Sequence, residues 1–173
     1  MNRDTITNPE KYKRGWHSGL PETECGFGSK MSQTVIQREW MQRVIDDLAP
    51  ASIADIGAGD LNWAKSMRLP EYQGYDLVPR HQEVREFNLL QDPVPQADML
   101  WCIWVINHLP EEAARIAMDK LTGSGAKWLI MTWDDRMWDF TDIPFVEEVM
   151  IRGPNGPSSK NEHHGVFMRL HEL

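Results

Sequence analysis

Ile53-Ala54-Asp55-Ile56-Gly57-Ala58-Gly59-Asp60 is the stretch of this sequence that indicates its fold. The apolar run over 52–56 predicts a short buried strand, and the two glycines after it let the backbone turn tightly and approach a ligand. A short helix is expected next, over 61–67. A strand, a glycine turn and a helix in succession are typical of nucleotide-binding α/β domains.

A second acidic position supports this interpretation. Asp76 ends the next expected strand, 72–78, and follows Gly57 by 19 residues, close to the roughly 20 expected between a glycine turn and a ribose-binding carboxylate. The alternative is a plain connecting turn with Asp76 solvated at the strand end. A dinucleotide is disfavoured, because the third glycine of its fingerprint is absent and because Asp55 and Asp60 would repel a pyrophosphate.

The remaining segments alternate between strand and helix patterns. Further strands are expected at 83–90, 98–106, 127–133, 145–151 and 165–170, and further helices at 32–48 and 111–121. Alternation as far as 133 predicts a parallel sheet with helices on both faces. The last two strands have no helix between them, so we expect an antiparallel hairpin at one edge.

Composition restricts the class of protein. A chain of 173 residues fits one domain, and its net charge of -8 disfavours broad binding to nucleic acid. Two cysteines are too few for a disulfide framework or for a four-cysteine zinc site. No apolar run resembles a signal peptide or a membrane span, which predicts a soluble, cytoplasmic protein. The eight tryptophans suit either core packing or a pocket for a flat or cationic ligand.

The sequence resembles the class I S-adenosylmethionine-dependent methyltransferases, in particular small bacterial and phage members without an assigned substrate. Residues 55–60 look like their first motif, Asp76 like their ribose-binding acid, and 97–102 with 107–110 like their fourth-strand motif. The resemblance runs from about Ser32 to the C-terminus. It implies a Rossmann-like three-layer α/β sandwich with a mostly parallel seven-stranded sheet and a C-terminal antiparallel hairpin. It also implies an enzyme that uses S-adenosyl-L-methionine.

The resemblance assigns cofactor-binding residues. It places the methionine part of the cofactor against Asp55 and the glycine turn, the ribose on Asp76 and the adenine against Leu77. The adenine amino group is assigned to Asn88, with Asp92 as the alternative. The full expected set is Lys30, Asp55, Gly57, Ala58, Gly59, Asp76, Leu77, Asn88, Leu89 and Trp104.

Two residues after the strand at 98–106 are candidates for catalysis. His108 is the titratable group near this strand end whose ordinary pKa lies near neutrality, and Asn107 precedes it. The alternative is that both cap the helix beginning near Pro110. The sequence lacks the motif of adenine and cytosine amino-methyltransferases, and Cys102 lies within the strand as a small hydrophobe. We predict no metal.

Three other segments are candidates for the substrate side or for a lid. Residues 133–138 and the pair His163-His164 could border the methyl acceptor, although a histidine pair in a polar loop is also typical of solvated surface. Residues 1–31 precede the catalytic domain at 32–173. Within 16–34, flexible Gly, Ser and Thr residues suit a lid in which Lys30 holds the cofactor carboxylate. The alternative is a tail without a role.

These observations predict a methyltransferase acting on a small molecule or on a modified sugar or base, with no membrane partner. The alternative is a methyltransferase-like module that binds the cofactor, or has lost it, and serves as a non-catalytic partner subunit. Binding of S-adenosylmethionine in a titration would distinguish these hypotheses from a protein of another class. Only an identified methyl acceptor would distinguish the enzyme from the non-catalytic module.

Overall fold

The computed structural model describes residues 20–134, 143–152 and 166–173. The strands are β1 (Ser52–Ile56), β2 (Glu71–Asp76), β3 (Val84–Glu86), β4 (Met99–Cys102), β5 (Trp128–Asp134), β6 (Glu147–Arg152) and β7 (Val166–Glu172). The α-helices are α2 (Val35–Leu48) and α3 (Glu111–Thr122). Three 3₁₀ turns complete the elements: η2 (Phe27–Ser29), η3 (Ala64–Ser66) and η4 (Ile106–His108).

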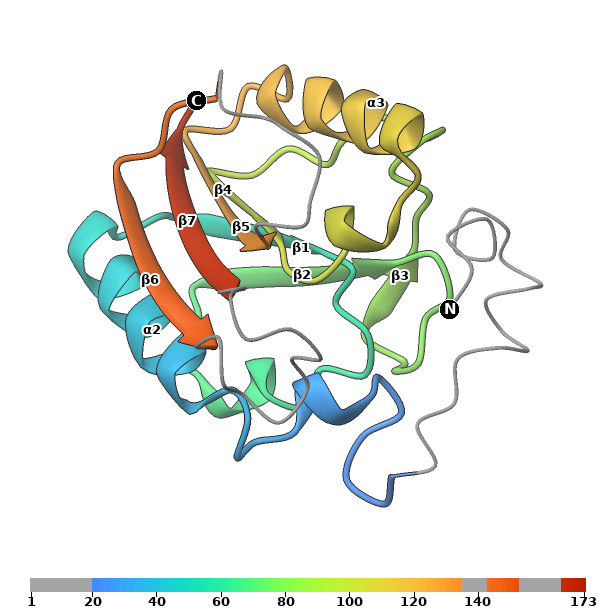
Figure 1. The fold of residues 1–173 in the computed structure, drawn as a ribbon, viewed down its shortest axis with the longest axis vertical. Helices are drawn as coiled ribbons and strands as arrows, with labels where there is room; N and C mark the ends of the chain where they lie inside the picture. Colours follow the sequence, from blue (N-terminus) through green and yellow to red (C-terminus); the bar gives the residue numbers. More distant parts are fainter. Residues whose placement is uncertain (1–19, 135–142, 153–165) are drawn as a thin grey trace.

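All seven strands form one sheet in the order β3-β2-β1-β4-β5-β7-β6. β1 to β5 run parallel, while β7 lies between β5 and β6 and is antiparallel to both (Figure 1). The mostly parallel sheet and the C-terminal antiparallel pair confirm the predicted fold class. Because parallel strands end at a common edge, the loops after β1, β2, β3 and β4 meet there, beside the end of β5.

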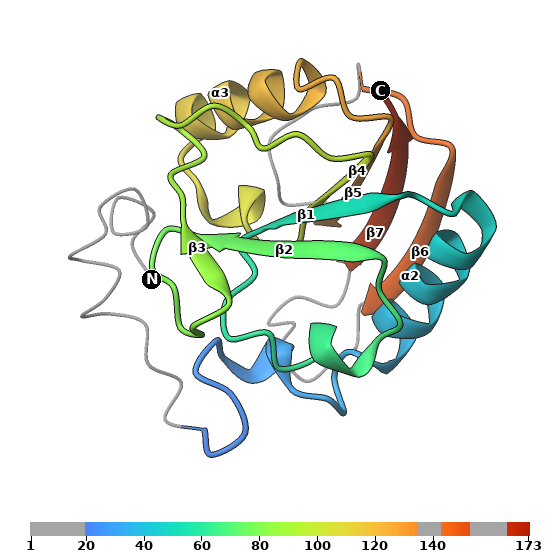
Figure 2. The same cartoon turned by 180° about the vertical axis from the view of Figure 1, so that it is seen from behind.

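Two helices cover the two faces of this sheet (Figures 1 and 2). α2 packs Trp40, Met41, Val44 and Ile45 against Ile53, Trp101 and Ile130. α3 packs Ala114, Ala117, Met118 and Leu121 against the residues of opposite parity, such as Ala54, Leu100 and Leu129. Alternate strand residues point to opposite faces, so the near-continuous apolar runs of β1, β4 and β5 fill two cores at once. Among the described residues, none of the helices is long and apolar enough to cross a membrane.

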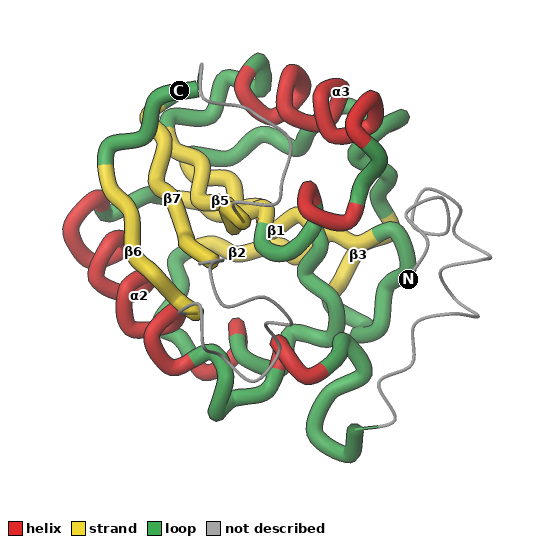
Figure 3. Tube along the Cα trace, in the orientation of Figure 1, coloured by secondary structure: helices red, strands yellow, loops and turns green. Residues whose placement is uncertain are grey.

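Two elements between β1 and β4, one expected helix and one expected strand, are shorter than the sequence pattern predicts. The expected helix at 61–67 is only the 3₁₀ turn η3, because Leu61 takes a left-handed conformation (φ 61°) and Pro70 limits the segment ahead. The expected strand at 83–90 is the three-residue β3, since Asn88 begins a turn closed by the Asn88 carbonyl and the backbone N–H groups of Gln91 and Asp92. Figure 3 shows that loops and short turns make the links from β1 to β4.

The strand expected at 98–106 also ends early, at Cys102. Trp104 has φ 59°, a conformation that a bulky side chain adopts only when its surroundings require it. Its backbone N–H donates to the Thr132 hydroxyl on β5 at 3.1 Å. The apolar run continues past this point, but the chain has already left the sheet.

Candidate functional site

A cavity of about 440 Å³ lies at the carboxyl edge of the sheet. Its walls come from the loops after β1 to β4, the end of β5, and residues 25–29 of the N-terminal segment. This is the position at which open α/β sheets bind ligands, because the loops diverge on either side of the central strands.

The loop after β1 forms the floor of the cavity. Gly57 (φ 87°) and Gly59 (φ 61°) both take left-handed conformations that favour glycine. The Gly57 and Ala58 N–H groups donate to the Tyr75 carbonyl at 2.7 and 3.0 Å, which ties the turn to β2. A Cβ atom on Gly57 would lie 2.2 Å from Val105 Cγ2, so only glycine fits without displacing the opposite wall.

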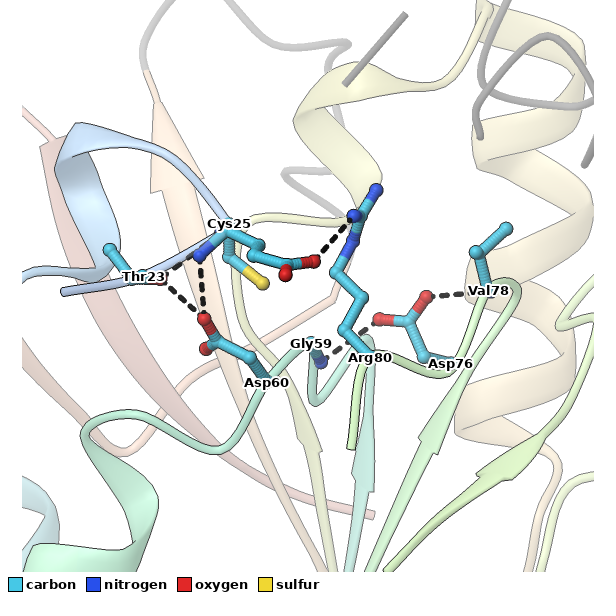
Figure 4. A network of polar contacts seen from close by, with 8 residues as sticks. Thr23, Cys25, Gly59, Asp60, Asp76, Val78 and Arg80 are labelled. Atoms are coloured by element: carbon cyan, nitrogen blue, oxygen red, sulfur yellow. Dashed lines mark hydrogen bonds and ion pairs between the residues drawn. The ribbon is translucent and has the colours of Figure 1, made fainter. Parts of the chain in front are cut away.

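Asp76 ends β2 at the side of this turn and is 7% exposed. Its Oδ2 accepts the Gly59 N–H and its Oδ1 accepts the Val78 N–H, each at 2.9 Å (Figure 4). A carboxylate oxygen can accept more than one hydrogen bond, so both oxygens keep acceptor capacity for a ligand. Burial raises the pKa of Asp76, and the two backbone N–H groups act in the opposite direction.

The N-terminal segment is held on the glycine turn by side chains of the turn itself. Asp60 Oδ2 accepts the Thr23 hydroxyl at 2.7 Å and the Glu24 N–H at 2.8 Å. Asn62 Nδ2 donates to the Ser29 carbonyl at 2.9 Å. Cys25 lies directly over Gly59 (Figure 4), where a Cβ atom on the glycine would approach its Sγ to 2.4 Å. These contacts place 25–29 as one wall of the cavity.

An ion pair on the same side joins this wall to the loop after β2. The Arg80 guanidinium, only 5% exposed, contacts Glu24 Oε2 at 3.2 Å. In Figure 4 its side chain runs from beside Asp76 towards the N-terminal segment. Arg80 therefore connects the strand that carries the predicted ribose acid with the segment expected to act as a lid.

Most of the residues expected to bind the cofactor or act in catalysis meet at this cavity. Those that line it are Gly57, Ala58, Gly59, Asp76, Leu77, Asn88, Leu89, Trp104, Asn107 and His108. Asp55 and Lys30 are not part of the lining.

The side chain of Asp55 lies within the sheet face covered by α2. It is 1% exposed and its Oδ2 accepts the Tyr72 hydroxyl at 2.6 Å. Strand alternation places Asp55 on the same face as Ile53, whereas the ligand side begins with the turn after Ile56. Burial raises the pKa of Asp55 to about 7, with the Tyr72 hydroxyl acting in the opposite direction.

Lys30 also lies outside the cavity lining. Its Nζ lies 5.4 Å from the centre of the Phe27 ring rather than in the cavity. Its carbonyl accepts the backbone N–H groups of Gln33 and Thr34, so the residue closes the turn that leads into α2. The N-terminal segment does reach the site, but through 25–29.

Asn88 lines the cavity, yet its side chain is already used in the local turn. Its Oδ1 accepts the Leu90 N–H at 3.0 Å, and its own N–H donates to Asp92 Oδ2 at 2.7 Å. Asp92, the alternative adenine contact, is outside the lining. The amide nitrogen of Asn88 is therefore the part of this side chain best suited to a ligand.

Asn107 and His108 lie in the 3₁₀ turn η4, not at the cap of α3. The N-cap of α3 is Pro110, with no side-chain hydrogen bond to the helix, so the capping alternative is wrong. Asn107 Oδ1 is buried and has no hydrogen-bond partner among the described residues. Both side chains instead belong to the cavity lining.

Several lining residues were not predicted as cofactor contacts. They are Cys25, Gly26, Phe27, Gly28, Ser29, Ile56, Asp60, Trp63, Phe87, Leu90, Ile103, Val105, Leu109 and Asp134. Asp134, 4% exposed at the end of β5, belongs to the segment expected near the acceptor, but residues 135–138 and His163-His164 lie outside the described residues. Trp63 and the apolar residues of this set belong to no sequence motif. Only their position after a strand could have indicated that they line the cavity.

Solved structures that share this architecture are methyltransferases. A SAM-dependent methyltransferase from Leishmania major aligns with TM-score 0.65 and 14% identity over 95% of this chain and 85% of its own. The N-methyltransferase NodS from Bradyrhizobium japonicum, in complex with S-adenosyl-L-homocysteine, aligns with TM-score 0.62 and 14% identity over 99% of both chains. The chain has the class I S-adenosylmethionine-dependent methyltransferase fold.

A third structure extends the comparison of this methyltransferase fold to another substrate. Magnesium protoporphyrin IX methyltransferase from Synechocystis, with bound SAM, aligns with TM-score 0.59 and 15% identity over 82% of this chain and 80% of its own. No protein-family model matches the sequence, and neither does any curated protein. The likeness is thus one of fold. In the part of the chain that the structure describes, no three His, Cys, Asp or Glu side chains gather as a metal site would require.

Proposed function

We propose that the protein is an S-adenosylmethionine-dependent methyltransferase whose acceptor is a small molecule or a nucleotide-like compound. The observation that carries this proposal is the pairing of Asp76 with the Gly57–Gly59 turn at the floor of one cavity. Solved proteins of this fold bind SAM or S-adenosyl-L-homocysteine, which supports the same ligand here.

The cavity residues fit this cofactor. Gly57 and Gly59 adopt the left-handed backbone of a tight turn that lines the cavity, and the side chains of Val105 and Cys25 pack where Cβ atoms would lie. Asp76 keeps acceptor capacity for the two ribose hydroxyls, and charge-assisted hydrogen bonds of this kind are strong. Leu77, Leu89 and Phe87 supply the apolar contact that an adenine ring requires.

When bound, S-adenosylmethionine supplies a methyl group on a positively charged sulfur, which a nucleophile can displace. The chain must then hold the nucleophile in line with that methyl group and keep water away. His108 can receive a proton from the nucleophile, since the ordinary pKa of histidine lies near neutrality. Asn107 can orient the nucleophile through its amide.

We also propose that residues 20–34 act as a lid over the cofactor. Support comes from Asp60 and Asn62, which bind this segment to the turn that would carry the methionine part. A bound cofactor would lie between residues 20–34 and the glycine turn and would stabilise the closed position of this segment. The lid would thereby exclude water from the reacting groups.

Isothermal titration calorimetry with S-adenosylmethionine and S-adenosylhomocysteine tests the proposed function. Asp76→Ala should weaken binding by about 2 kcal/mol or more, roughly 30-fold, because two charge-assisted hydrogen bonds are lost. Asp76→Asn, which keeps one acceptor for the backbone, separates loss of the ligand contact from loss of the fold. Asp47→Ala on the exposed face of α2 is the matched control.

Three outcomes of the titration are informative. No binding at millimolar cofactor would contradict the proposal, and unchanged affinity in Asp76→Ala would mean that the ribose is held elsewhere. Binding without transfer to any acceptor would favour the alternative function, a non-catalytic cofactor-binding module or partner subunit.

A further inference from the structure

The part of the cavity beside β4 and β5 is distinct from the part assigned to the cofactor. β2 and β3 lie on one side of β1, whereas β4 and β5 lie on the other. Asp76, Leu77 and Asn88 come from the first side and suit ribose and adenine. Trp104, Asn107, His108 and Asp134 come from the second side and surround the space left for an acceptor.

Asn107 presents a buried hydrogen-bond acceptor in this part of the cavity. Its Oδ1 is buried without a partner among the described residues. Buried polar atoms in native proteins are nearly always satisfied, and leaving an acceptor unpaired is costly. A carbonyl oxygen can only accept, so the partner that it lacks is a donor. An acceptor molecule with an N–H or an O–H group would supply one from the side of β4 and β5.

The charges of the lining restrict the acceptor further. On the side of β4 and β5 the acidic side chain of the lining is Asp134, and over the described part of the chain the lining contains no lysine or arginine. A phosphate or carboxylate on the acceptor would meet this acidic group without a basic lining residue on the same side. The aromatic ring of Trp104 on this side favours a positively charged group.

We propose that the acceptor is a primary or secondary amine, an inference that rests on the proposed methyltransferase function. Asn107 Oδ1 accepts an N–H of the amine and thereby aims the nitrogen lone pair at the methyl group. The lone pair forms the new C–N bond while the C–S bond breaks and sulfur keeps the electron pair. The surplus proton on nitrogen passes to His108 or to water.

The sign of the charge that develops distinguishes an amine from an alcohol. Transfer to an amine builds positive charge on nitrogen, which the carboxyl group of Asp134 and the ring of Trp104 stabilise. Transfer to a hydroxyl requires partial negative charge on oxygen as its proton leaves. Asp134 opposes that charge, so this side of the cavity favours the amine.

Transfer of a radiolabelled methyl group to matched compound pools tests this inference. One pool holds small primary and secondary amines, a second holds the corresponding alcohols, and a third holds their phosphorylated forms. We expect the label in the amine pool to exceed that in either other pool by about ten-fold or more. Asn107→Leu should lower transfer to amines about ten-fold while S-adenosylhomocysteine affinity stays unchanged. Gln82→Leu, an exposed amide outside the lining, should leave both unchanged.

The results separate this inference from the function on which it rests. Label mainly in alcohols or phosphorylated compounds would overturn the amine assignment alone. Label in no pool while S-adenosylhomocysteine binds would overturn the amine assignment and favour the non-catalytic module. Full transfer by Asn107→Leu would remove the role of its carbonyl. Failure to bind S-adenosylhomocysteine would overturn the proposed function itself.

Discussion

Gly57 occupies a position at the cavity where both the backbone conformation and the packing favour glycine. Its left-handed backbone (φ 87°) and the 2.2 Å approach of a Cβ atom to Val105 Cγ2 are two separate penalties for any other residue. The conformational penalty is about 1–2 kcal/mol, whereas the clash depends on whether Val105 can move.

Gly57→Ala should therefore lower both cofactor affinity and the free energy of unfolding. Adding Val105→Ala removes the clash and should recover part of each loss, while the backbone penalty remains. Calorimetric titration with S-adenosylhomocysteine and urea unfolding measure the two quantities. Equal values for the single and the double variant would show that Val105 does not limit this site.

Asp55 controls stability rather than ligand contact, and its effect depends on pH. Burial raises its pKa to about 7, so between about pH 4 and pH 7 the folded protein holds a proton that the unfolded chain has lost. The stability supplied by this group is therefore present at low pH and is lost as pH rises through 7.

Asp55→Asn should remove this pH dependence, since an amide does not ionise. The free energy of unfolding of the variant, relative to that of the wild type, should increase from pH 5 to pH 8 by a few kcal/mol. Urea unfolding at the two pH values measures the change, with the exposed Asp47→Asn as control. Parallel pH profiles for Asp55→Asn and the wild type would contradict a buried, protonated Asp55.

The N-terminal segment acts at the scale of an element. Residues 16–34 were expected to form a lid or a tail, and within the described part of this segment Thr23, Glu24 and Ser29 contact the loop after β1. Each of these hydrogen bonds contributes only about 1 kcal/mol, so the segment can open unless a ligand adds further contacts.

Trypsin cleavage after Lys30 tests this lid. We expect S-adenosylhomocysteine to slow the cut in the wild type, and Asp60→Ala to accelerate it by removing the acceptor for Thr23 and Glu24. Cleavage after the exposed Lys127, which directly precedes β5 and is not part of the cavity lining, provides the internal control. Equal rates at Lys30 with and without ligand would mean that the segment is a tail.

At the scale of the whole molecule, one cavity joins the loops after four parallel strands, the end of β5 and the N-terminal segment. A ligand bound there contacts both sides of β1 and stabilises the folded state alone. Binding should therefore raise the melting temperature of the entire domain rather than that of one loop.

S-adenosylhomocysteine at a hundred-fold excess over its dissociation constant should add about 2.7 kcal/mol, or about 5–10 °C in melting temperature for a chain of this size. Scanning calorimetry measures the shift. NAD⁺ should give none, because the glycine turn suits no pyrophosphate. A larger shift with NAD⁺ would favour a dinucleotide-binding protein instead.

The local features of this fold could be predicted from the sequence. The apolar runs of β1, β4 and β5, the glycines at 57 and 59, and Asp76 at its spacing are properties of neighbouring residues. They depend on strand alternation, on the conformational freedom of glycine and on chain length between two turns. These properties therefore predicted the sheet, its terminal hairpin and many of the residues that line the cavity.

Only the tertiary structure decided which of the chemically plausible side chains face the ligand. Asp55 is one residue from the turn, yet strand parity places it against Tyr72, and Lys30 lies against Phe27 while Cys25 covers Gly59. The unpaired oxygen of Asn107 likewise appears only once η4 is packed beside β5. Side-chain direction and hydrogen-bond satisfaction depend on segments tens of residues apart, and no local pattern in the sequence records those contacts.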